Sequence, residues 1–316
     1  MVEHGGRARG VTPLAAEAVP LRFQIGARTL ASIARRLVRL PLSLDTVLDG
    51  PLPILPPLAR SADGYAVTSL PEHGLASLRR AAGGMIGYVR QRYPRHYADL
   101  TIGFAAYQAA LSGNTRSGLK RKTKRVIALS GGALDVRRFR TADELGAFHA
   151  VARGISQRTY QERLLGGGLP DDPAFVHTMT ALAAAGQVRA WLLYVAGEPA
   201  AYLYCPIEGG TVRYDHVGHD PAFNDLSPGG VLMLEAMRDL YAEPGLTRFD
   251  FTEGDGQHKR SFATAGVACV DVLLLRPTLA NRATITALEA FDRGAAWAKH
   301  AVARLGLERV ARRVRR

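Results

Sequence analysis

The sequence predicts an α+β protein that folds as more than one compact unit. The chain has 316 residues, whereas a single hydrophobic core stops growing at about 250 to 300 residues. Its composition, 47% hydrophobic and 22% charged, suits a globular protein with buried cores. From residue 141 onward, the patterns follow the order helix, helix, three strands, helix, strand, loop and strand. That order is typical of a sheet flanked by helices.

The part before residue 141 is dominated by short apolar segments. Up to about Ala128 they alternate with proline and glycine, as in GPLPILPPLARSADG. Because proline and glycine interrupt regular elements, we expect strands and loops with few long helices here.

Two helices open the second part. Thr141, followed three residues later by Glu144, forms a capping-box pattern at the start of the first helix. The second helix has Pro173 near its start and Gly186 just past its end. Proline suits a first helical turn and glycine a helix end.

The strands that follow are interrupted by one helix. Glycine-containing turns separate three strand candidates, which suits an antiparallel meander over residues 188–197, 198–209 and 211–220. A helix then begins at Ser227 as N-cap and Pro228 as first helical residue, and strands at 246–252 and 267–277 complete the order. The helix is a crossover, so the strands it joins should be parallel neighbours.

Basic residues are concentrated in two segments. The formal net charge is +13; Arg116 to Arg125 holds six basic residues and no acidic one, and Arg282 to Arg316 holds nine basic against three acidic residues. The second segment has a helical apolar stripe, including Leu288 and Phe291, which predicts a docked helix with a basic end.

The expected location is the cytoplasm. Cys205 and Cys269 lie in apolar runs, which favours buried, reduced thiols over a disulfide. The N-terminus lacks the apolar core of a secretory signal, and no run approaches the roughly 20 apolar residues of a membrane span.

Two stretches together resemble a known superfamily. VGHDPAFNDLSPGGVLMLEAM followed by RFDFTEGDGQHKRSF is similar to the GNAT acyltransferases, and more narrowly to the BioF2-like branch. That branch includes the proteins called CelD in cellulose biosynthesis and is related to the FemAB aminoacyltransferases. The matching features are Phe249-Asp250-Phe251, Gly254-Asp255, His258-Lys259, Phe262, the basic segment LSGNTRSGLKRKTKRV and the stretch TYQERL. His258 departs from the branch's usual tyrosine.

The resemblance covers roughly residues 108 to 277 and implies tandem GNAT-like units, each a mixed, mostly antiparallel sheet flanked by helices. The expected domains are a flexible N-terminus at 1–20, a degenerate GNAT-like domain at 21–128, the acyltransferase domain at 129–277 and a basic helical tail at 278–316.

The start of the crossover helix is the expected site for the acyl donor. Ser227, Gly229 and Gly230 place small residues at a first helical turn, where the positive end of the helix dipole favours phosphate. The resemblance puts the pyrophosphate of coenzyme A here, with Val217 and Gly218 as further cofactor-binding residues. Asn224 and Asp225 depart from the usual pattern, which indicates altered acyl-CoA binding. The alternative is an ordinary helix start.

The turn after strand 246–252 is the expected catalytic segment, because the fold implied by the resemblance splays its sheet there. Acyl transfer to an amine needs a proton acceptor and a group that stabilises the oxyanion. We expect Asp250 or Glu253 to act as the base or amine anchor, and Lys259 as the oxyanion or phosphate partner. Alternatively, the turn is structural and Lys259 a surface residue.

The strand RYDHVGH offers substrate-binding candidates. Asp215 or His216, facing the cleft, can help to deprotonate an amine. His216 and His219 are three residues apart on a strand and should point to opposite faces, which argues against a metal site.

The basic segment at 116–125 has two interpretations. Its glycine spacing resembles a phosphate-binding loop, but Leu119 occupies the position of the required lysine. It is either a solvated helix face or a site for a polyanion such as a nucleotide-sugar diphosphate, coenzyme A or tRNA.

The sequence therefore predicts a metal-independent N-acyltransferase. It would move an acyl group, acetyl in the first place, from acyl-CoA to an amine of a small molecule or polysaccharide precursor. Two alternatives stay open: aminoacyl transfer from charged tRNA, and a non-catalytic scaffold of an exopolysaccharide system. The acceptor and the oligomeric state are open as well.

Overall fold

The computed structural model describes residues 14–25, 28–159 and 168–304, and the chain divides into two compact units. Unit 1 comprises Met1–Arg92 and Ala268–Arg316, and unit 2 comprises Tyr93–Val267. The predicted functional domains, 21–128 and 129–277, have other limits, and their assignment stays a prediction.

Unit 1 contains a mixed sheet with the strand order β1-β2-β3-β11-β4. β1 and β2 are antiparallel, β2 and β3 are parallel, and β3 and β11 are antiparallel. The strands are β1 (Glu17–Ile25), β2 (Arg28–Pro41), β3 (Gly64–Pro71), β4 (Ile86–Asp99) and β11 (Ala265–Leu275), of which β4 and β11 continue into unit 2.

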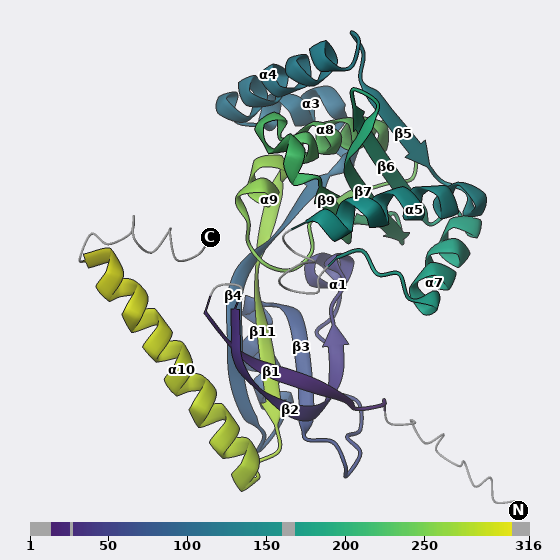
Figure 1. The fold of residues 1–316 in the computed structure, drawn as a ribbon. Coiled ribbons are helices and arrows are strands. Elements are labelled where there is room, and N and C mark those ends of the chain that lie inside the picture. Colours follow the sequence, from purple (N-terminus) through teal and green to yellow (C-terminus); the bar gives the residue numbers. More distant parts are fainter. Residues whose placement is uncertain (1–13, 26–27, 160–167, 305–316) are drawn as a thin grey trace, which may run out of the picture. The chain divides into compact units, whose positions relative to one another are not determined.

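The described helices of unit 1 are α1 (Leu44–Asp49), α2 (Leu75–Ala81), the short η1 (Glu72–Gly74) and the long α10 (Leu279–Arg304). Figure 1 labels α1 and α10. Leu288 of α10 is buried with Leu21, Leu37 and Leu273, and Phe291 meets Phe23 edge to face at 5.4 Å. The segment therefore forms a helix that packs through its apolar stripe, as predicted. Its basic end, Arg309 to Arg316, lies outside the described residues.

In unit 2 the same strand path continues, mixed and mostly antiparallel, in the order β4-β10-β8-β7-β6-β5, and β9 pairs with β7 off this path. The added strands are β5 (Asp135–Phe139), β6 (Val188–Val195), β7 (Glu198–Glu208), β8 (Thr211–Arg213), β9 (His216–His219) and β10 (Arg248–Asp250). β10 runs parallel to β8 and antiparallel to β4. The parallel neighbours predicted for the crossover are confirmed.

Helices cover both faces of this sheet, because successive strand residues point to opposite sides. Leu193 and Leu203 join a core with α8 (Pro228–Tyr241), α4 (Gly113–Leu129) and α3 (Phe104–Ala110). Leu192 and Tyr202, one residue earlier on the same strands, join a second core with α5 (Ala142–Arg158) and α7 (Pro173–Ala184). The predicted α+β class is confirmed.

The predicted helix signals of α5 and α7 are present. Thr141 and Glu144 form a reciprocal capping box at the start of α5. The Asp172 side chain caps α7, Pro173 is its first residue, and Gly186 beyond its end has a φ of 72°, which favours glycine.

Some details differ from the sequence-based expectation or lie beyond it. The loop after β10 contains the short helix α9 (Gln257–Phe262), and two short helices, η2 (Leu100–Ile102) and η3 (Pro221–Leu226), are additional. Ser227 precedes α8 with φ 49° and ψ 55° and makes no side-chain cap. Ser227 thus occupies the predicted N-cap position, but its side chain does not cap the helix. Of TYQERL, only Thr159 lies within the described residues.

Cys205 and Cys269 are both buried, as predicted. In the described part of the chain, no helix is long and apolar enough to cross a membrane.

Candidate functional site

A cavity of 620 Å³ lies in unit 2, where β9 separates from the end of β10. β8 and β10 pair over three residues, and the Tyr214 N–H donates to the Asp250 carbonyl at 2.9 Å. Beyond this bond the chain turns to follow β7 as β9. Tyr214 and Phe251, from the two separating segments, both line the cavity.

The five residues predicted to bind the cofactor are brought together around this cavity. They come from β9, from the residue before α8 and from the first turn of α8: Val217, Gly218, Ser227, Gly229 and Gly230. Gly218 is required sterically, because a Cβ there would lie 2.5 Å from the Tyr202 ring. The glycine thus lets β9 approach β7 closely.

The start of α8 forms one wall and has an unusual backbone. Ser227 adopts the left-handed conformation, and its carbonyl accepts the Gly230 N–H at 3.0 Å. A Cβ at Gly229 would meet no atom within 4 Å. This wall combines open space with the positive end of a helix dipole, so it suits an anionic group.

Two histidines also line the cavity, and sequence reasoning assigned neither a role there. His258, on α9, lies 5.9 Å from Tyr214 between ring centroids. Burial, and secondarily the charge of Lys259, lowers the pKa of His258 below its ordinary value of 6.5. His219 Nε2 hydrogen-bonds to Asn224 Oδ1 at 2.8 Å. The imidazole of His258 is therefore neutral at pH 7 and can accept a proton.

The three predicted catalytic residues are not among the residues that line the cavity. Asp250 is fully buried, and its carboxylate accepts Arg95 Nε at 3.1 Å, Arg95 Nη2 at 2.6 Å and the Thr252 N–H at 2.8 Å. Lys259 Nζ donates to the Glu253 carbonyl at 2.5 Å. The turn thus brings Asp250, Glu253 and Lys259 into one charged cluster with Arg95.

Lys259 has a perturbed charge equilibrium in this cluster. Burial lowers its pKa, and Arg95 acts in the same direction, whereas Glu253 and Asp250 act against it. Thr252, within the turn, has a φ of 60°. Perturbed ionisation and a left-handed non-glycine residue are both common at functional sites.

Neither of the two predicted substrate-binding residues lines the cavity; Asp215 interacts electrostatically with Asp250 and Glu253 of this cluster. Asp215 pairs with Arg213 at 2.9 Å, and burial raises its pKa against the effect of Arg213. His216 packs on Phe175 and Tyr204, with ring centroids 5.2 and 5.9 Å away, and burial lowers its pKa. Among the described residues, no group of three or more His, Cys, Asp or Glu side chains is arranged to hold a metal.

Residues 113–260 match the sequence profile of a family described as Acetyltransferase (GNAT) domain. The matched range contains the separating strands, the first turn of α8 and His258. This part of the chain is a GNAT-type acetyltransferase domain. A search of curated proteins finds no match.

Solved structures share the fold at low identity. A conserved protein of unknown function from Bacteroides thetaiotaomicron VPI-5482 has a TM-score of 0.50 and 13% identity, over 67% of this chain and 70% of that one. L-PGS from Bacillus licheniformis has a TM-score of 0.45 and 13% identity, over 71% of each chain. FemX has a TM-score of 0.46 and 12% identity, over 68% of this chain and 73% of that one. At 13% identity the Bacteroides structure shows likeness of fold alone.

Proposed function

We propose that this GNAT domain uses an acyl-CoA, acetyl-CoA in the first place, to acylate an amine of a small molecule or a polysaccharide or cell-envelope precursor in the cytoplasm. The observation that carries the proposal is the shared cavity of the separating strands and the first turn of α8. Its volume of 620 Å³ falls in the range of small-molecule sites. The BioF2-like features of the sequence support the class of acceptor.

The wall of the cavity suits the two chemical parts of such a donor. The first turn of α8, with Gly229 and Gly230, offers a positive helix end for the diphosphate. Met233, Phe251 and Phe262 supply apolar surface for the thioester arm.

For the reaction we propose direct attack. The amine nitrogen forms a bond to the thioester carbon, the carbon–sulfur bond breaks, and coenzyme A leaves as the thiol. His258 is our candidate for accepting the amine proton, since it lines the cavity and is neutral at pH 7. For Asp250, Glu253 and Lys259 we propose that their mutual contacts hold the turn that carries His258.

Ligand binding and turnover test the proposal together. Acetyl-CoA should raise the melting temperature, because a ligand that binds only the folded state stabilises it. Incubation with acetyl-CoA and a panel of amines, including amino sugars, should release free thiol. Stabilisation by bulk tRNA alone would favour aminoacyl transfer, and stabilisation by neither ligand would favour a scaffold.

A further inference from the structure

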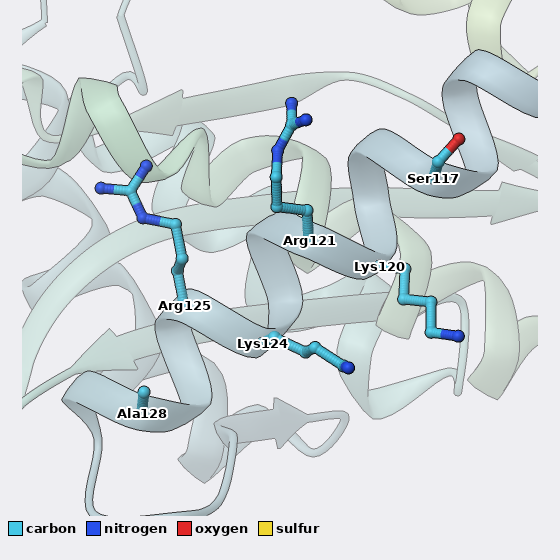
Figure 2. Close-up of a pocket in the computed structure, with 6 residues that line it drawn as sticks. All are labelled: Ser117, Lys120, Arg121, Lys124, Arg125 and Ala128. Atoms are coloured by element: carbon cyan, nitrogen blue, oxygen red, sulfur yellow. The ribbon is translucent and has the colours of Figure 1, made fainter.

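The exposed face of α4 carries a second concave surface. Ser117, Lys120, Arg121, Lys124, Arg125 and Ala128 line a shallow cavity of 480 Å³ (Figure 2). Their spacing of three and four residues places them on one helix face. Figure 2 shows that Arg121 and Arg125 extend to one side of the helix and Lys120 and Lys124 to the other. We call Arg121 and Arg125 the arginine edge of α4.

The cations of this face are not neutralised within the part of the chain that the structure describes. No acidic side chain there forms an ion pair with Lys120, Arg121, Lys124 or Arg125. Elsewhere in unit 2, arginines are paired, as Arg138 is with Asp239 at 2.5 Å. Unpaired cations clustered on one surface attract anions.

The arginine edge adjoins the wall of the 620 Å³ cavity. Arg125 Nη1 donates to the Asp225 carbonyl at 3.3 Å, and the neighbouring Asn224 lines that cavity. Leu119, on the packed face of α4, has its Cδ2 3.6 Å from the position of a Cβ at Gly230. The helix that carries the edge therefore packs directly on the first turn of α8.

We infer that the arginine edge binds the ribose 3′-phosphate of the acyl-CoA donor. This inference rests on the proposed function, which places the diphosphate at the first turn of α8. Coenzyme A carries a separate phosphate on the ribose, at the end of the molecule remote from the thioester. When the diphosphate of the donor lies against α8, the 3′-phosphate lies beyond the cavity. The arginine edge is the cationic surface that adjoins the cavity there.

The residue type supports this choice of ligand. A guanidinium group presents a planar pair of donors that matches phosphate oxygens, whereas an ammonium group acts as a point charge. Two arginines four residues apart lie one above the other on a helix, so both can reach a single phosphate. The 3′-phosphate would thus be a determinant of donor specificity.

The test compares coenzyme A with 3′-dephospho-coenzyme A by calorimetry, using the full chain and the variant Arg121→Gln/Arg125→Gln. Wild type should bind coenzyme A about tenfold more tightly than the dephospho form, the effect expected of charge-assisted hydrogen bonds. The variant should bind both ligands alike, at the wild-type affinity for the dephospho form. Lys120→Gln/Lys124→Gln removes the same charge from the same helix and should keep the tenfold preference.

Each other outcome overturns the inference in a distinguishable way. If neither ligand binds wild type, the proposed function fails and the inference fails with it. If the arginine variant keeps the preference, acyl-CoA binding stands and the arginine edge is not its site. Equal losses in the arginine and lysine variants would indicate general electrostatic attraction instead. Loss of bulk tRNA binding with both coenzyme affinities unchanged would identify an RNA surface. Melting curves without ligand show whether each variant is folded.

Discussion

The carboxylate of Asp250 illustrates how burial decides what a side chain can do. It ends β10 within hydrogen-bonding distance of Arg95, and both side chains are almost completely buried. Buried ion pairs contribute little net stability, but removing one partner leaves an uncompensated charge. A structural role for Asp250 therefore predicts a change in stability, and a catalytic role predicts a change in turnover.

We expect Asp250→Asn to lower the free energy of unfolding by about 3 kcal/mol, because the buried Arg95 guanidinium loses its counter-charge. Urea unfolding measures the change. The double replacement Arg95→Met/Asp250→Leu should recover part of the loss, since it removes both charges. Wild-type stability combined with a large loss of turnover would instead support Asp250 as the catalytic base predicted from the sequence.

His258 predicts a pH dependence of the reaction. Its pKa is lowered in the folded protein, so the imidazole is neutral at pH 7 and becomes protonated only as the pH falls below 6.5. The value of kcat/KM should therefore decline on the acidic side of pH 6.5. His258→Gln should reduce kcat by about a hundredfold and abolish this decline, because a general base contributes at least that much.

The control is His177→Gln on the exposed face of α7, which should change neither the rate nor the pH profile. A His258→Gln variant with the rate and acidic decline of the wild type would show that another group accepts the proton.

The ends of α8 and β10 shape the cavity more than their interiors do. Ser227 before α8 and Thr252 after β10 are both left-handed, with φ values of 49° and 60°. Such residues cost about 1–3 kcal/mol each and persist where the surrounding structure holds them. Here the strained residues immediately precede and follow cavity-lining segments.

Gly229→Asp should weaken acetyl-CoA binding by about tenfold, equivalent to about 1.4 kcal/mol. The new carboxylate would repel the diphosphate at the first turn of α8. The substitution should not unfold the protein, since a Cβ at Gly229 meets no atom within 4 Å. An acidic side chain is also favourable near a helix N-terminus. Calorimetric titration measures the affinity.

Gly229→Ala adds the Cβ without the charge and should bind acetyl-CoA like wild type. If the alanine variant loses as much affinity as the aspartate variant, shape and not charge governs this wall. Unchanged affinity in Gly229→Asp would show that the diphosphate does not bind at the first turn of α8.

The charge of the entire chain leads to a prediction about its basic end. Residues Arg309 to Arg316 lie outside the described residues, and their composition suits a solubilising tail. We expect that deleting them leaves kcat and the melting temperature unchanged. Weaker binding of acetyl-CoA or tRNA by the truncated protein, most visible at low salt, would instead show that the tail holds a polyanion.

The last strand shows where sequence reasoning stops. The apolar run at 267–277 predicts a strand, and β11 is one. Residues from Ala268 onward belong to unit 1, where β11 pairs with β3 in the register Cys269↔Pro71. Which strand β11 pairs with depends on residues about two hundred positions away in the sequence, and no local pattern contains that information.

The sequence by itself determined the local elements and the residues gathered at the start of α8. A capping box, a proline at a first turn or an apolar period involves residues only a few positions apart, so it can be read along the chain. The tertiary structure alone decided that Asp250 pairs with Arg95, 155 residues away, and that Arg125 reaches Asp225, 100 residues away. It also placed His258 in the cavity and left Asp250, Glu253 and Lys259 out of its lining. Burial and charge pairing arise only when distant segments pack, and they determine which side chains can meet a substrate.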